Sequence, residues 1–219
     1  MLRIHVENAL PVETSVHWHG IRLHNGSDGV PGLTQEPVAP AAGFIYEFLA
    51  PDPGTYFFHP HSGVQIDRGL YSPLIIGDPA EPGGYDHEWV PVLDDWTDHY
   101  LINGRIPRSP RTLTARPGQR ARIRIINAAA DTLFRVALGG HVMTVTHTDG
   151  FPVQPVETRA LHLAQGERVD VLVTLGDGVF PLVAAAEGKG GQGVALVAPD
   201  PVPRLRPPSA RKSWTPTRC

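Results

Sequence analysis

The feature that most constrains the fold of this chain is a succession of short segments in which apolar and polar residues alternate. Glycine, proline, aspartate and asparagine separate these segments, and no stretch of helical length shows a 3.6-residue period. Alternation with period two places every second side chain on one face of a β-strand. Short strands with turn residues between them are typical of sandwiches and barrels. The pattern predicts an all-β protein with strands in LRIHVEN, SVHWHGIRL, GFIYEFLA, GTYFFHPH, SPLIIGD, HEWVPVLDDW, RARIRIIN, TLFRVALGG, HVMTVTH, RALHLA, RVDVLVTL, FPLVAAAE and GVALVA.

An internal repeat divides the strands into two units. RIHVENAL, which contains Asn8, resembles RIRIINAA, which contains Asn127, and DPGTYFFHPH resembles GDGVFPLVAA. The offset between the copies is 119 residues at Asn8 and Asn127, and it grows to 124 at Gly54 and Gly178, as loop insertions would produce. A repeat of this length predicts two copies of one β-sandwich in tandem.

The composition between and after these units sets the expected domain boundaries. DPAEPGGYD is rich in turn residues, and the last residues of the chain have linker composition. We therefore predict a first domain over residues 1–79, a linker over 80–86, a second domain over 87–200 and a linker-like tail over 201–219.

Charge, hydropathy and cysteine content exclude several classes of protein. The net charge is −3 with histidine neutral, which does not indicate a nucleic-acid partner or a polybasic membrane patch. No apolar run approaches the about 18 residues of a membrane span, and MLRIHVENAL lacks the features of a signal peptide. The single cysteine, Cys219, excludes disulfides within the chain and thiolate-rich zinc sites.

Two pairs of histidines, each interrupted by one residue, form the strongest candidate site. HWHG contains His17 and His19, and HPHSG contains His59 and His61. Residues i and i+2 of a strand share one face, so each pair is a two-pronged imidazole ligand. Imidazole binds copper, zinc, iron and nickel, and the residue types alone do not select the metal. The alternative is a set of half-buried strand histidines that bond to the backbone.

The second copy of the repeat carries no histidine at the matching positions. The offsets align the first pair with Val136 and Leu138, and the second pair with Val183 and Ala185. The fold therefore does not require histidine at these positions, which indicates a site added to a scaffold.

The motifs resemble those of a known family. HWHGI, DGVPGLTQEPVAP and PGTYFFHPHSGVQIDRGLYSPLIIGDP resemble the first domain of the multicopper oxidases, a laccase-like family of cupredoxin repeats. GHVMTVTHTDGFPVQPV and GERVDVLV resemble that family's second domain, so the resemblance covers nearly the whole chain. It implies two tandem cupredoxin-like Greek-key β-sandwich domains. It also implies copper in a trinuclear cluster that couples the oxidation of a small reducing substrate to the reduction of O₂ to water.

The resemblance also assigns the ligands within that cluster. His17 resembles the ligand of the type 2 copper, and His19, His59 and His61 resemble ligands of the type 3 pair. The family's third domain supplies the other four cluster histidines and the type 1 copper site, and neither has a counterpart in this sequence. We interpret Cys219 as incidental, because SWTPTRC contains no histidine.

Both ends of the chain look cut when the two copies are compared. We expect the missing ligands to come from an absent third domain or a partner chain, and the site to lie at an exposed surface. The resemblance implies a laccase-like oxidoreductase fragment that is inactive in isolation, in an extracytoplasmic or secreted location. The alternative is a copper-binding or structural cupredoxin pair without turnover. Neither the substrate nor the oligomeric state follows from the sequence.

Further residues invite a functional interpretation. Asp28 lies where the family places an acidic residue near the type 2 copper, so it is a candidate proton relay, although Asp149 holds the same place in the copy without ligands. Trp18 lies between two candidate ligands and is predicted to face the core. We predict a solvated loop for the acidic run Asp94, Asp95 and Asp98 with Trp96, and structural or surface roles for His5, His24, His87, His99, His141, His147 and His162.

Overall fold

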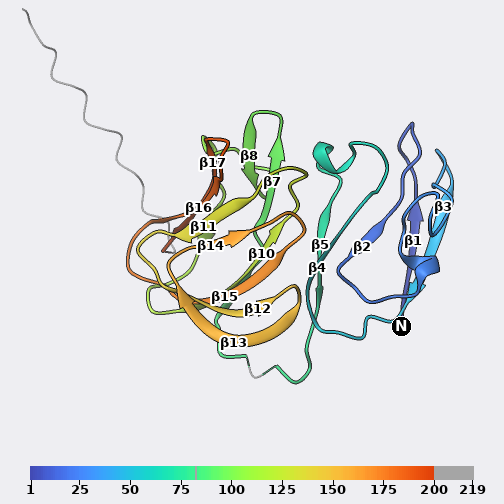
Figure 1. The fold of residues 1–219 in the computed structure, drawn as a ribbon. Coiled ribbons are helices and arrows are strands. Elements are labelled where there is room, and N and C mark those ends of the chain that lie inside the picture. Colours follow the sequence, from blue (N-terminus) through green and yellow to red (C-terminus); the bar gives the residue numbers. More distant parts are fainter. Residues whose placement is uncertain (82, 200–219) are drawn as a thin grey trace, which may run out of the picture.

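The structure is a computed structural model that describes residues 1–81 and 83–199. These residues form seventeen strands and two short 3-10 helices, which confirms the predicted all-β class. Figure 1 shows two groups of strands side by side, β1–β5 in one half and β6–β17 in the other. No helix within the described residues has the length and apolar character needed to cross a bilayer. The predicted tail over 201–219, including Cys219, lies outside the described part of the chain.

The first half consists of two small antiparallel sheets. One sheet pairs β1 with β3, and the other has the order β2-β4-β5. Its core is mainly aromatic and includes Trp18, which is 3% exposed as its predicted core position requires. The elements are β1 (Leu2–Glu7), β2 (His17–His19), η1 (Asn25–Ser27), β3 (Gly43–Phe48), β4 (Gly54–His59), η2 (Ile66–Arg68) and β5 (Ser72–Ile76).

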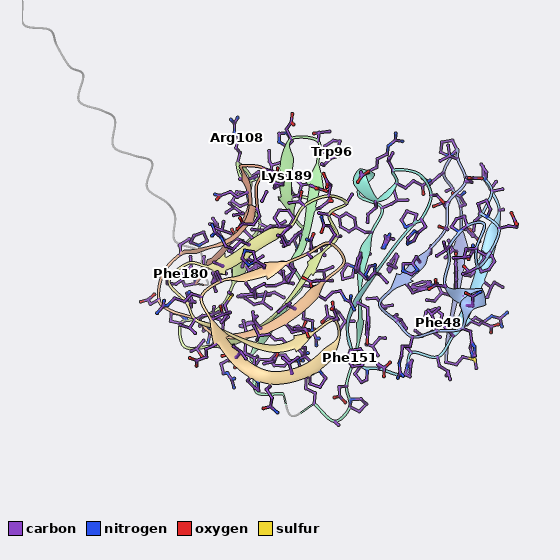
Figure 2. All side chains as sticks on the ribbon, in the orientation of Figure 1. Phe48, Trp96, Arg108, Phe151, Phe180 and Lys189 are labelled. Atoms are coloured by element: carbon purple, nitrogen blue, oxygen red, sulfur yellow. The ribbon has the colours of Figure 1, made fainter. Side chains whose placement is uncertain are left out.

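The second half consists of two larger sheets that enclose a mainly aliphatic core. One has the order β13-β12-β15-β10-β7-β8 with β6 also against β10, and the other has the order β14-β11-β16-β17-β9. Figure 2 shows Phe48 among the side chains of the first half and Phe180 among those of the second. The strands are β6 (His87–Trp89), β7 (Val92–Trp96), β8 (His99–Ile102), β9 (Thr112–Thr114), β10 (Arg120–Asn127), β11 (Phe134–Leu138), β12 (Met143–Thr148), β13 (Phe151–Thr158), β14 (Leu161–Leu163), β15 (Arg168–Thr174), β16 (Phe180–Ala186) and β17 (Gln192–Ala198).

A pair of buried asparagines shows the repeat directly. The side-chain amide of Asn8 donates to two backbone carbonyls, and its side-chain oxygen accepts the N–H of the residue two positions later. Asn127 makes the same three bonds, and all six distances lie between 2.8 and 3.0 Å. The backbone carbonyls of Asn8 and Asn127 also accept from Ala41 and Gly166, each at 2.9 Å. The two asparagines therefore close the same loops in each half.

The strand pairing corrects the alignment of the first histidine pair by one residue. In the first half, Trp18 pairs with Phe58 and faces the core. In the second half, Leu138 pairs with Leu182 and faces the core, so Leu138 is the equivalent of Trp18. A shift of one residue moves a side chain to the opposite face of a sheet. Val136 therefore faces the core and is not equivalent to a candidate ligand.

The true equivalents of His17 and His19 are Ala137 and Gly139. Ala137 pairs with Val183 across β11 and β16, as His17 pairs with His59 across β2 and β4. The matches of Val183 and Ala185 to the second histidine pair agree with this register. All four equivalent positions still carry small or apolar residues, so the conclusion drawn from the repeat stands.

The two halves meet along β4. Phe57 packs against Val92, Ile126 and Ala128 of the second half. Beside this apolar contact, the Thr55 hydroxyl donates to Asp170 at 2.7 Å and accepts from Arg124 at 3.0 Å, within a buried network. The strand that carries His59 is therefore attached directly to the second half of the molecule.

Candidate metal centre

The four histidines of the two pairs lie together. β2 and β4 are antiparallel neighbours, and their register sets His17 opposite His59. The ring centroid of His17 is 5.6 Å from His19, 5.4 Å from His59 and 4.7 Å from His61. Ring nitrogens of His17, His59 and His61 lie within 4.8 Å of one another. The two pairs thus form one cluster of imidazoles.

His19 joins the group through His59. Its Nδ1 is 3.1 Å from His59 Nε2, and its ring stacks on Phe57 with a centroid distance of 4.4 Å. On another side, the ring lies against the backbone of Gly166 in the second half: a Cβ built on that glycine would be 2.7 Å from His19 Cε1. The orientation of His19 therefore depends on both halves.

Two backbone carbonyls determine which ring nitrogens carry hydrogen. His17 Nδ1 is 2.8 Å from the carbonyl oxygen of Asp28, and His59 Nδ1 is 3.2 Å from that of Pro60. A carbonyl only accepts, so both Nδ1 atoms donate and both Nε2 atoms keep a lone pair. His19 Nδ1 then donates to His59 Nε2, which leaves a lone pair on His19 Nε2 as well. Bonds of this kind are how proteins orient metal-binding imidazoles.

Burial favours the neutral form of these imidazoles. It lowers the pKa of His59 to about 4, and together with the nearby Arg168 charge it lowers that of His19 to about 3. Burial also lowers the pKa of His61. Near pH 7 the three rings are therefore uncharged, which is the form that binds metal ions.

The site lies in a hollow between the two halves. A cavity of about 350 Å³ is lined by His19, His59 and His61 on one side and by residues 127–130 and 165–166 on the other. His59 is only 8% exposed, whereas His61 is exposed. The expected exposure at the surface is therefore found at His61 but not at His59. The second half covers His19 and His59, and the cavity opens to solvent at His61.

The sequence did not reveal the residues that form the far wall. Ala128, Ala129 and Gly166 have no chemistry of their own, and they reach the histidines only through the packing of two domains. The repeat offered the one signal for this wall: Gly166 is equivalent to Ala41, whose N–H donates to the backbone carbonyl of Asn8.

Asp28 contacts a candidate ligand mainly through its backbone. Its carboxylate Oδ1 is 3.3 Å from His17 Nδ1, farther than its carbonyl oxygen. In the matching turn, Asp149 Oδ1 instead lies 3.1 Å from Arg168 Nη1. The turn is shared by the two copies, but its carboxylate has a different partner in each.

The acidic run is not a solvated loop, which corrects our prediction for two of its residues. Asp94 is 2% exposed and accepts a 2.8 Å hydrogen bond from the Tyr71 hydroxyl of the first half. Asp95 accepts from the Ala130 N–H and the Thr132 hydroxyl. These carboxylates lie within β7 at the contact between the halves, whereas Trp96 at the end of β7 is 53% exposed (Figure 2).

The other histidines do not join the cluster. The histidines His17, His59 and His61 are the one group of three or more potential metal ligands found among residues 1–81 and 83–199. His141 is as buried as His59, and it bonds to the Gly139 carbonyl and the Gly176 N–H. Its role is structural, as predicted.

Comparisons with known proteins agree with this geometry. A family model described as "Multicopper oxidase" matches residues 1–81, and a second model with the same description matches residues 87–199. "Multicopper oxidase MmcO" of Mycobacterium tuberculosis is 46% identical over 256 residues, covering 93% of this chain and 51% of that protein. "Laccase-1" of Botryotinia fuckeliana is 34% identical, covering 78% of this chain and 35% of that protein. The chain spans about half or less of the length of these curated relatives.

Solved structures show the same architecture. The Blue Copper Oxidase from Nitrosomonas europaea matches with a TM-score of 0.83 at 25% identity, covering 98% of this chain and 78% of that one. The laccase from Botrytis aclada matches with a TM-score of 0.80 at 31% identity, covering 98% of this chain and 48% of that one. These likenesses confirm the predicted fold of two tandem cupredoxin-like β-sandwiches.

Proposed function

The chain belongs to the multicopper oxidase family, and from that premise we propose that His17, His19, His59 and His61 provide half of the ligands of a trinuclear copper cluster. The observation that carries the proposal is the convergence of four imidazoles, three from the paired strands β2 and β4 and one, His61, from just beyond β4; three of the four have a lowered pKa. Copper bound in such a cluster would pass electrons from a small reducing substrate to O₂, which is reduced to water.

The donor atoms fit copper. All four are imidazole nitrogens, and neutral imidazole binds copper ions well. We assign His17 to the type 2 copper and the other three histidines to the type 3 pair. The carbonyl of Asp28 holds the ring of His17 so that its Nε2 lone pair is free for a metal, and the carbonyl of Pro60 orients His59, whose Nε2 can bind a metal once the hydrogen bond from His19 Nδ1 opens.

We propose that a further cupredoxin domain or a partner chain supplies the remaining ligands. This is supported by the open side of the cavity at His61, where a second set of imidazoles could approach. The type 1 copper site and the contact with substrate would belong to that additional part. The ends of the family models support the domain division at residues 79 and 87. The family resemblance favours an extracytoplasmic or secreted location.

For Asp28 we propose proton delivery to reduced oxygen. Its side chain is 33% exposed and lies next to His17, so it can exchange protons with solvent while it contacts the site. Replacement by Asn would keep the backbone carbonyl that orients His17 and remove the acid.

A copper-binding pair without turnover is the second candidate for this chain by itself. It is favoured by the donor set, which offers four imidazoles and no cysteine within residues 1–81 and 83–199. Four ligands shared among three copper ions leave each ion with one or two protein nitrogens, so we expect weak copper binding and no oxidation of phenols under air.

A copper titration with matched variants tests the proposal. The purified chain is titrated with Cu²⁺ by calorimetry and electron paramagnetic resonance, alongside His59→Ala and His141→Ala, whose imidazoles are equally buried at 8% exposure. Binding should be lost in His59→Ala and retained in His141→Ala. Equal binding by both variants would contradict the site, and phenol oxidation by the unmodified chain would contradict the assignment of half a cluster.

A further inference from the structure

We propose that Arg168 of the second domain is a positioning residue for the histidines of the first domain, an inference that rests on the proposed copper function. Arg168 begins β15, in the motif GERVDVLV, and carries no candidate ligand atom. Its guanidinium nevertheless contacts the neighbours of both histidine pairs. The two pairs would lose their common alignment without it.

The guanidinium is buried and fully engaged. The side chain is 5% exposed, and its Nε donates to the Thr55 carbonyl at 3.1 Å. Its Nη1 donates to the Gly166 carbonyl at 2.9 Å, and its Nη2 donates to the Asp149 carbonyl at 3.1 Å. The Asp149 carboxylate, 3.1 Å from Nη1, balances the charge. The rigid fork of arginine donors fits this set of acceptors, whereas lysine has one flexible ammonium group.

The first contact with the site is at the residue after His19. A Cβ built on Gly20 would lie 2.3 Å from Arg168 Nη2, so the guanidinium occupies the space where a side chain at that position would be. Gly20 has a φ of 86°, which only glycine adopts easily. The turn that ends β2 thus packs directly against the guanidinium of Arg168.

The second contact is through Gly166, whose carbonyl Arg168 holds. The His19 ring packs against this same glycine, where a Cβ would be 2.7 Å from Cε1. The guanidinium therefore fixes both the backbone after His19 and the wall against which its ring rests.

The third contact is on β4. The Thr55 carbonyl that accepts from Arg168 precedes His59 by four residues in the same strand, and the guanidinium carbon is 5.6 Å from the centroid of the Tyr56 ring. One side chain thus holds β4 and the end of β2 in one frame. This is the alignment that brings the two histidine pairs together.

If Arg168 only stabilises the fold, its replacement should lower stability without a specific effect on the histidines; if it positions them, the histidines should also change. Arg122 provides the matched control: its side chain is 4% exposed and bonds to Asp170 and Glu81, away from the turn after His19. Lysine at either position should lower the free energy of unfolding, because both guanidinium groups are buried among acceptors. Lysine at position 168 should disturb the histidines directly, whereas lysine at position 122 reaches them only through Asp170 and Thr55 and should disturb them much less.

The test uses the full chain with Arg168→Lys, Arg122→Lys and Asp149→Asn. Asp149 is 53% exposed, so its variant should fold and should only loosen the guanidinium. The ¹⁵N and ¹³C signals of the imidazoles are recorded by NMR without metal, and Cu²⁺ affinity is measured by calorimetry. Urea unfolding shows which variants are folded.

We expect Arg168→Lys to shift the His19 and His59 signals and to weaken Cu²⁺ binding about 10-fold, the lower range for residues that support a ligand. Asp149→Asn should shift the same signals by less, and Arg122→Lys should shift them least of the three. If Arg168→Lys does not fold, the Asp149→Asn spectrum decides the question. Unchanged imidazole signals in the folded variants, or equal shifts in Arg122→Lys, would overturn the proposal. If the unmodified chain binds no Cu²⁺, the copper function fails, while the metal-free spectra still test Arg168.

Discussion

The two domains share one backbone plan but use the same strand pair differently. In the second domain, Ala137, Gly139, Val183 and Ala185 occupy the positions that carry histidine in the first. The buried asparagines and their loops are the same in both. Features present in both copies therefore serve the fold, and features present in one copy carry the chemistry.

The domains also differ in what they contribute to the site. The first supplies the four imidazoles from a small aromatic sandwich, and the second supplies a wall and Arg168 from a larger aliphatic one. The smaller domain carries the candidate ligands, and by our proposal it depends on the larger one for their orientation. The second domain can therefore lack histidines at the equivalent positions and still be needed to hold those of the first domain.

The largest effect is expected when the first domain is given the residues of the second. A variant with His17→Ala, His19→Gly, His59→Val and His61→Ala should lose copper-dependent stabilisation, which for one site amounts to about 2.7 kcal/mol at a copper concentration of 100 Kd. Without metal its unfolding free energy should change by less than about 2 kcal/mol, because the second domain folds with these residues. Urea unfolding with and without Cu²⁺ measures both. Copper stabilisation that survives in the variant would place the site elsewhere.

Substitution of the two buried asparagines tests the hydrogen-bonded loops that both domains share. Asn127→Ala should cost about 2.5 kcal/mol, because it leaves two buried carbonyls and one N–H without partners. Asn8→Ala should cost about half as much, because two of its three bonds are only partly buried. Urea denaturation of each variant gives these values. Equal costs would contradict the inferred difference in burial between the two loops.

Asp94, at the contact between the domains, should make stability depend on pH. Burial raises the pKa of Asp94 to about 6, so the folded state holds this proton up to a higher pH than the unfolded chain does. Its contribution to stability is therefore complete below about pH 4 and is lost as the pH rises through 6.

In the variant Asp94→Asn the side chain at this position cannot ionise. Its stability relative to the original chain should rise by about 2 kcal/mol between pH 4 and pH 7. Urea denaturation at several pH values measures this difference, and the change with pH matters rather than the absolute stability. A difference that stays constant across the range would show that Asp94 is ionised normally in the folded protein.

The smallest effect is expected at the loop residue whose N–H donates to the backbone carbonyl of each asparagine. Ala41 has a φ of 60°, where its equivalent Gly166 has a φ of 79°. Ala41→Gly should stabilise the protein by about 0.5 kcal/mol, since relief of left-handed strain exceeds the added chain entropy. The converse Gly166→Ala should destabilise it and displace the His19 ring. Thermal unfolding and the His19 NMR signal distinguish the two, and a stabilising Gly166→Ala would contradict the packing.

Local patterns predicted much of this structure. Alternation and turn residues located most strands, and the spacing of the histidines located the site, because both depend on neighbours along the chain. The strand β13 was missed because Pro152 and Pro155 interrupt its pattern; it lies at a sheet edge, where proline is tolerated.

Features that depend on distant partners were not predictable in this way. Val136, Ala137 and Leu138 are all apolar, so composition could not choose the register that the pairing with β16 determines. The burial of Asp94 depends on Tyr71 in the other domain. The cover over His19 depends on Gly166, whose importance lies in having no side chain.

The polar contact of Thr55 with Asp170 and Arg124 has a mechanical consequence. A hinge motion between the domains would take the Thr55 hydroxyl away from two charged groups that are almost fully buried, and would break both of its hydrogen bonds. These bonds oppose such a motion and help to keep the histidines aligned before any partner arrives. A partner that closes over them meets a preformed template, and little of its binding energy is spent on ordering this side of the interface.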